Sequence, residues 1–234
     1  MPPFLAPRTA FLTTTISPPP TRSTPLAGTP GMSSAACPAD PVQALRLATR
    51  QRHERLDAAL PISRDDASLA DHAHHLAAVR DWQRALMPWL SRTDADLSGL
   101  RLIEADLAEP GAAGLGVLAP AAVDLRPVHD ADDGSDAFCW GIAYVLEGSR
   151  LGGQVLYRRL QARLAPHPLR YLGQRSGAGG DWPRTLASLR HHLATPAAVA
   201  AGSRGAMAAF DVLLTRFGLE PRGAAPSCEG HFDA

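Results

Sequence analysis

One short segment of the 234-residue chain combines an imidazole, a carboxylate and two guanidinium groups at helical spacing. If residues 45–57 form a helix, Arg46, Thr49, Arg50, His53 and Asp57 share one face. A neutral imidazole is a common iron ligand, and a carboxylate four residues later can accept its second ring N–H. Arginines one and two turns earlier could pair with the carboxylates of a bound ligand. An ordinary amphipathic helix with a solvated Arg/His/Asp face gives the same pattern, so this segment alone leaves both interpretations open.

A second segment, residues 144–156, contains three glycines within six residues of a helical pattern: Gly148, Gly152 and Gly153. Each glycine inside a helix costs ~1 kcal/mol relative to alanine, so the cluster calls for a physical reason. Glycine permits a kink and lets the backbone approach a flat ligand closely. A close crossing of two helices is the alternative reason.

The periodicity of apolar residues predicts an all-α chain with no strand of period two. Cap residues followed by proline mark the starts at Asp40-Pro41 and Thr195-Pro196. We expect helices over residues 41–60, 68–90, 96–107, 136–164, 181–194 and 196–218, with a loop over 110–127. This gives one helical domain, residues 41–220, between a Pro/Thr/Ser-rich N-terminal tail (1–40) and a C-terminal tail (221–234).

Composition and charge argue against several classes of function. The net charge is zero and the isoelectric point is about 7.1, so neither nucleic acid nor a membrane surface is an expected partner. No apolar run is expected to approach the length of a membrane span, and the threonine-broken stretch at 11–16 is a poor export signal. Three cysteines do not build a disulfide framework, so we expect a reducing, cytoplasmic location.

Some chemically suggestive residues are set aside. Ser149 lacks the Gly-x-Ser-x-Gly turn of a hydrolase nucleophile. His72, His74 and His75 have no carboxylate or cysteine set to complete a metal site, so we interpret them as a polar helix face. The acidic cluster at residues 130–136 lacks the spacing of a calcium loop and is interpreted as a solvated loop.

The two segments together resemble the heme oxygenase family. Leu45, Ala48-Thr49 and His53 are similar to its proximal helix, and Gly148-x-x-x-Gly152-Gly153-Gln154-Val155-Leu156 is similar to its distal helix. Glu147-Gly148-Ser149 followed by Leu151-Gly152-Gly153 resembles the bacterial branch, which includes enzymes that supply bilin to bacteriophytochromes. The resemblance extends over about residues 45–217 in order and type.

This resemblance implies a multihelical bundle with heme held between a proximal helix and a kinked distal helix. His53 would be the iron ligand and Asp57 would orient it. Arg46 and Arg50, with Arg184 as a further candidate, would contact the heme propionates. The distal residues implied are Gly148, Ser149 and Gly152 at the reacting face, with Gly153 also against the heme.

The implied reaction is the oxidative opening of heme to biliverdin with release of CO and iron, in which heme is both substrate and cofactor. Oxygen and an external electron donor, a ferredoxin or a reductase, are required, and a bilin-accepting phytochrome is a further partner. The chain departs from many family members at Ser149, where they carry aspartate. That departure leaves open a non-catalytic heme carrier or sensor. Two further alternatives are a thiaminase-like bundle for another small molecule and a helical partner-binding module.

Overall fold

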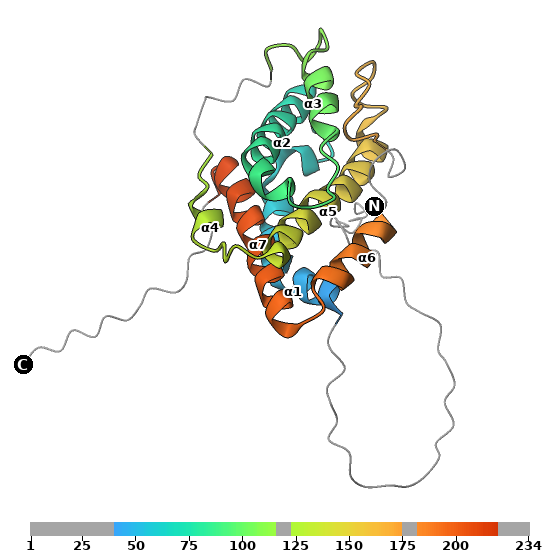
Figure 1. Cartoon of the computed structure of the whole chain (residues 1–234). Coiled ribbons are helices and arrows are strands. Elements are labelled where there is room, and N and C mark those ends of the chain that lie inside the picture. Colours follow the sequence, from blue (N-terminus) through green and yellow to red (C-terminus); the bar gives the residue numbers. More distant parts are fainter. Residues whose placement is uncertain (1–39, 116–122, 175–181, 220–234) are drawn as a thin grey trace, which may run out of the picture.

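A computed structural model describes residues 40–115, 123–174 and 182–219, and every regular element in these ranges is helical. The elements are α1 (Pro41–Ala59), the short 3-10 turn η1 (Pro61–Ser63), α2 (Leu69–Leu90), α3 (Gly99–Leu107), α4 (Arg126–His129), α5 (Asp136–Leu160), α6 (Trp182–His192) and α7 (Pro196–Arg216) (Figure 1). The expected all-α class is confirmed for these ranges. Apart from Asp40, the predicted tails lie outside the described residues.

Local capping explains where the helices begin. Before α2, the Ser68 hydroxyl accepts a hydrogen bond from the Asp71 N–H, and the Asp71 carboxylate accepts one from the Ser68 N–H. Thr195 caps α7 in the same way by accepting from the Ala198 N–H at 3.1 Å. Asp40 does precede α1, but its carboxylate makes no capping bond and pairs instead with Arg190 of α6.

Several of the expected boundaries differ from those of the structure. The α3 helix begins at Gly99 rather than at 96, because the Asp96 carboxylate accepts hydrogen bonds from the Ser98 N–H and hydroxyl and so forms a turn. The α5 helix ends at Leu160, not 164, ahead of Pro166, which cannot continue a helix. In addition, α6 ends at His192 rather than 194, and α4 lies partly inside the stretch predicted as a loop. The expected cap at Asp181 lies outside the described residues.

A very close crossing of α5 and α7 forms the centre of the bundle. A Cβ atom on Gly141 would overlap the Gly202 carbonyl oxygen, and one on Gly205 would overlap the Phe138 carbonyl oxygen. These positions tolerate only glycine, because each contact is with backbone that cannot move aside. The crossing that the sequence offered as one explanation for Gly148–Gly153 therefore exists, but at other glycines.

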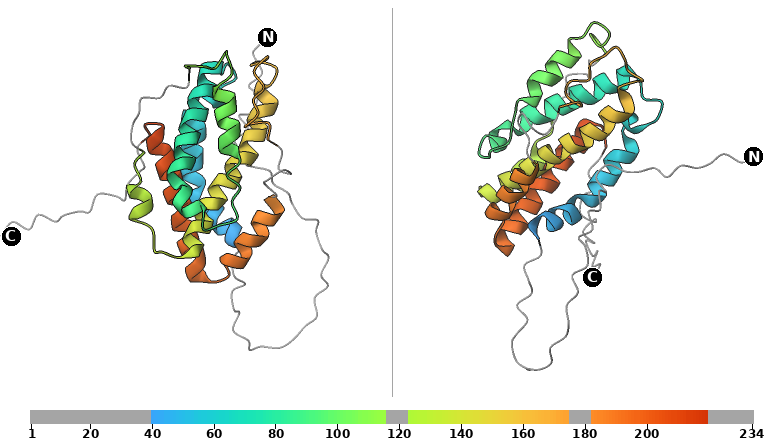
Figure 2. Two further views of the ribbon diagram at one scale, coloured as in Figure 1. Left: turned by 45° about the horizontal axis from the view of Figure 1, so that its top comes forward. Right: turned by 90° about the vertical axis from the view of Figure 1, so that its right-hand side faces the viewer.

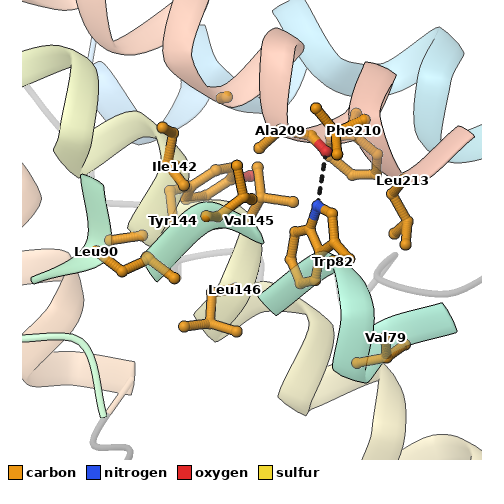
Figure 3. Close-up of a cluster of buried hydrophobic side chains, with 14 of the residues drawn as sticks. Val79, Trp82, Leu90, Ile142, Tyr144, Val145, Leu146, Ala209, Phe210 and Leu213 are labelled. Atoms are coloured by element: carbon orange, nitrogen blue, oxygen red, sulfur yellow. Dashed lines mark hydrogen bonds between the residues drawn. The ribbon is translucent and has the colours of Figure 1, made fainter. Parts of the chain in front are cut away.

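The remaining helices flank this pair. The two views of Figure 2 place α1 on one side of α5 and α7, and α2 with α3 on the other. The buried Trp82 of α2 ties the layers together, since its indole N–H donates to the Ala209 carbonyl of α7 at 2.9 Å (Figure 3). The bundle thus holds α1 and α5 on α7 as a common support.

The α7 helix is long and apolar enough to cross a membrane, judged by length and composition alone. The expectation that no apolar run reaches this length was therefore wrong. Of its most apolar stretch, 56% is buried inside the bundle. Its central position against α1 and α5 gives a physical reason for its apolar composition.

Candidate functional site

A bidentate ion pair between Arg52 and Asp211 fixes the rotation of α1 against α7. The Arg52 guanidinium donates to both carboxylate oxygens of Asp211 on α7, at 2.7 and 2.8 Å. Asp211 is buried, so the pair is shielded from bulk water. His53 follows in the chain, and its ring meets the Phe210 ring edge-on at a centroid distance of 5.8 Å. Thus the helix register places His53 beside α7 rather than in open solvent.

His53 and Asp57 are brought together as the sequence predicted. His53 Nδ1 lies 3.1 Å from Asp57 Oδ2, and their side chains are 23% and 17% exposed. Asp57 Oδ2 is buried and has no well-aligned hydrogen bond in the described part of the chain. A slight rotation of the imidazole would align the Nδ1–H with this oxygen and leave Nε2 pointing away from the Asp57 carboxylate. The pair therefore fits a histidine that uses Nε2 as a metal ligand.

The three arginines predicted to contact the heme propionates lie in different structural environments. Arg46 of α1 lies near enough to Tyr144 of α5 for its charge to influence the pKa of the tyrosine. Burial raises the pKa of Tyr144, and the nearby Arg46 charge partly opposes that rise. Arg50 is exposed and makes only a long contact, 3.9 Å, with Glu54. Arg184 is exposed near the start of α6. Among the described residues, Arg46 is thus the one of the three arginines found near a side chain of α5.

Open space lies beside α5 at Gly148. Gly148 is buried, yet no heavy atom of the described residues lies within 4 Å of a Cβ added there, apart from the helix's own backbone. The α1 and α5 helices run in the same direction and share few or no close backbone contacts, although both pack on α7 (Figure 2). His53 and Gly148 follow Arg46 and Tyr144 along α1 and α5 respectively. The open space at Gly148 leaves room for an added group beside α5.

The other glycines of the segment differ from Gly148. A Cβ on Gly153 would lie 3.6 Å from the Leu172 side chain, so this glycine packs against residues 169–174 rather than bordering open space. Gly152 is buried. The α5 helix continues through all three glycines without a break in its helical residues.

The α5 helix also carries a buried polar network. Arg150 pairs with Glu147 at 2.9 Å and also donates to the Asp96 carbonyl. Burial raises the pKa of Glu147, and the Arg150 charge opposes it. The partly buried Ser149 hydroxyl donates to the Leu146 carbonyl at 2.6 Å.

Several of these residues were not predicted as site residues. Tyr144 precedes Gly148 by one helical turn, so the spacing alone could have indicated it. Phe210 and Asp211 come from a distant helix, and no local signal links them to His53.

The histidines set aside at the start are not all surface residues. His74 is exposed, but His72 is fully buried and its ring lies edge-on to that of His167 at a centroid distance of 5.2 Å, so the polar-face interpretation was wrong for His72. Within residues 40–115, 123–174 and 182–219, no three His, Cys, Asp or Glu side chains gather as a metal-ion site. A cavity of about 800 Å³ near His167, lined also by Ser68, Glu109 and Arg163, includes none of the predicted site residues.

Comparison with known proteins gives one informative similarity. The chain is 38% identical over 90 residues to a heme oxygenase from Xanthomonas campestris pv. campestris (strain 8004). The match covers 38% of this chain and 54% of the relative, so the chain spans about half the length of that protein. No family model matches the chain, and no solved structure matches it. The similarity supports the resemblance to heme oxygenases that the proximal and distal segments indicate.

Proposed function

We propose that this protein binds heme in the gap between α1 and α5 and opens the ring. The observations that carry the proposal are the buried open space at Gly148 on α5 and the His53–Asp57 pair on α1, both helices being packed on α7. The named activity of the Xanthomonas protein supports it independently. His53 would ligate the iron, Asp57 would orient the imidazole, and Phe210 would limit its tilt.

The other predicted residues have defined parts in this proposal. Arg46, Arg50 and Arg184 would contact the propionates, and of these Arg46 lies near Tyr144 of α5. The backbone at Gly148 and Gly152 would approach the ring face and limit the room above it. Gly153 would act indirectly, because its contact with Leu172 holds that turn of α5 in place. When bound, heme supplies the iron that activates oxygen and the ring that is opened.

The products would be biliverdin, CO and iron, with oxygen and electrons supplied from outside by a ferredoxin or a reductase. The bacterial-type distal motif supports a bilin-accepting phytochrome as the recipient of the product. The expected location is the cytoplasm, where such donors are found.

Hemin titration of the purified chain tests the site. We expect one hemin per chain, with the absorption spectrum of imidazole-ligated iron. A His53→Ala variant should lose that spectrum and regain it when free imidazole is added. The matched control is His74→Ala, which removes an exposed histidine and should leave the spectrum unchanged. An unchanged spectrum in His53→Ala would refute the proposal and favour a bundle that binds another small molecule.

A heme carrier on the same scaffold is the second candidate. It is favoured by Ser149, whose hydroxyl proton is directed to the Leu146 carbonyl and which brings no charge to the gap. A carrier would keep its hemin intact in the presence of oxygen and reductant, whereas the enzyme would consume it.

A further inference from the structure

Asp106, near the end of α3, has a carboxylate that is completely buried. One carboxylate oxygen accepts a hydrogen bond from the Arg170 N–H at 3.0 Å, and the other accepts one from the Tyr171 N–H at 2.9 Å. The exposed Arg170 guanidinium adds only a longer contact of 3.4 Å. The Asp106 carbonyl lies 3.0 Å from Nε2 of the buried His167. Because a buried charge must be paired or hydrogen-bonded, these contacts commit Asp106 to the segment that follows α5.

The segment that Asp106 holds contains a strained residue. Leu169 has a φ of 50°, in the left-handed region that leucine rarely adopts, and it is fully buried. Its N–H donates to Nδ1 of His167 at 3.2 Å, and its carbonyl accepts from the Gly173 N–H at 2.8 Å. A backbone conformation of this kind persists only where the surrounding contacts over-determine it. The two backbone hydrogen bonds to Asp106, made by the next two residues, are among those contacts.

The same segment packs on α5 at its distal glycines. A Cβ on Gly153 would lie 3.6 Å from the Leu172 side chain and 3.8 Å from the Leu172 Cα. One turn further along α5, the Tyr157 ring lies so close to Gly173 that a Cβ there would be 2.9 Å from it. The buried Leu172 is thus fixed between α5 and the backbone that Asp106 holds.

We propose that Asp106 is a positioning residue for the distal face of the heme site. It holds the backbone of residues 170–171 and thereby sets where Leu172 packs on Gly153. The backbone of Gly152, the preceding residue of α5, is placed by the same contact. This inference rests on the proposed function, in which Gly152 approaches the ring, and Asp106 acts only through the segment rather than on the ligand.

The first test is made on the apoprotein. Asp106→Asn keeps the size of the side chain but removes its charge and one of its two acceptor oxygens. Hydrogen exchange should become about tenfold faster or more at the amides of residues 170–171, because a hydrogen bond to a charged group contributes at least that factor to a local opening equilibrium. Exchange at the amides of residues 152–153 should also become faster. The control Thr195→Ala removes the cap of α7 and lowers the stability of the domain, but it should not single out these amides.

The second test is made with hemin bound, reduced and exposed to CO. The C–O stretching band reports on the groups beside the bound molecule, so Asp106→Asn should shift or broaden it, whereas Thr195→Ala should leave it in place. Leu172→Ala removes the contact with Gly153 and serves as a second variant if Asp106→Asn folds poorly. It should change the band without speeding exchange at residues 170–171. In the Leu172→Ala background, Asp106→Asn should add little further change to the band.

The outcomes separate this inference from the proposed function. Faster exchange at residues 170–171 in Asp106→Asn, with residues 152–153 and the CO band unchanged, would overturn the inference. The same local changes in Thr195→Ala would overturn it too, because they would reflect a general loss of stability. A protein that binds and opens hemin but gives either result refutes this inference alone. A protein that binds no hemin refutes the proposed function, and the role of Asp106 toward the ligand with it.

Discussion

Replacing Gly148 offers a way to separate folding from ligand binding. In an ordinary helix interior, alanine is more favourable than glycine by about 1 kcal/mol. Since no described heavy atom lies within 4 Å of a Cβ at this position, Gly148→Ala should stabilise the apoprotein by about 0.5 to 1 kcal/mol. Gly148→Leu should fold as well, because leucine is also a good helix former, but its side chain would occupy the space proposed for heme.

The two effects have different sizes and different assays. Urea denaturation of the apoprotein gives the free energy of unfolding, and hemin titration gives the dissociation constant. An overpacking cost of about 3 kcal/mol in Gly148→Leu corresponds to roughly 100-fold weaker hemin binding. Gly141→Ala is the matched control: its Cβ would overlap the Gly202 carbonyl oxygen, so it should destabilise the apoprotein by about 3 kcal/mol. Hemin binding by Gly148→Leu at wild-type affinity would refute the assignment of this space to heme.

Two further perturbations test the support of the site and its surroundings. Arg52→Ala leaves the buried Asp211 carboxylate without its partner and should lower the free energy of unfolding by about 1 to 3 kcal/mol. The control Arg50→Ala removes only an exposed 3.9 Å contact and should change the free energy of unfolding by less than about 0.5 kcal/mol. Equal effects of the two variants in urea denaturation would contradict the proposed anchoring of α1. Burial lowers the pKa of His72 to about 3 from 6.5, so the unfolded chain takes up a proton at this residue before the folded chain does. Stability from this residue is complete above pH 6.5 and should be lost progressively as the pH falls toward 3, by up to about 1 kcal/mol per pH unit. His72→Leu should flatten this acid dependence of the urea midpoint and the exposed His74→Leu should not; a slope unaffected by His72→Leu would show that His72 is not buried in its neutral form.

Local patterns in the sequence predicted the helices and the His53–Asp57 pair, because both depend on spacings of a few residues. Ser68 and Thr195 cap their helices as the short-range signals indicated. The start of α3 was predicted too early because the Asp96 side chain forms a turn by accepting hydrogen bonds from Ser98. The periodicity of apolar residues does not reveal such a turn.

Long-range placement could not be predicted in this way. Nothing near Arg52 in the sequence indicates that Asp211, 159 residues later, will receive its guanidinium. The glycines also have different structural roles, and their spacing in the sequence could not show which glycine has which role. Gly148 borders open space, Gly153 packs on Leu172, and the close helix crossing occurs at Gly141 and Gly205. Packing between distant segments decides which glycine has which part.

The central claim is most directly tested by following bound hemin when electrons are supplied. Purified chain with one equivalent of hemin is given oxygen and either ascorbate or a ferredoxin system, and the products are separated by chromatography. We predict loss of the Soret band, appearance of biliverdin, and about one CO per heme opened. A Soret band that persists under these conditions, with no bilin and no CO, would contradict ring opening and leave a heme carrier as the function of this site.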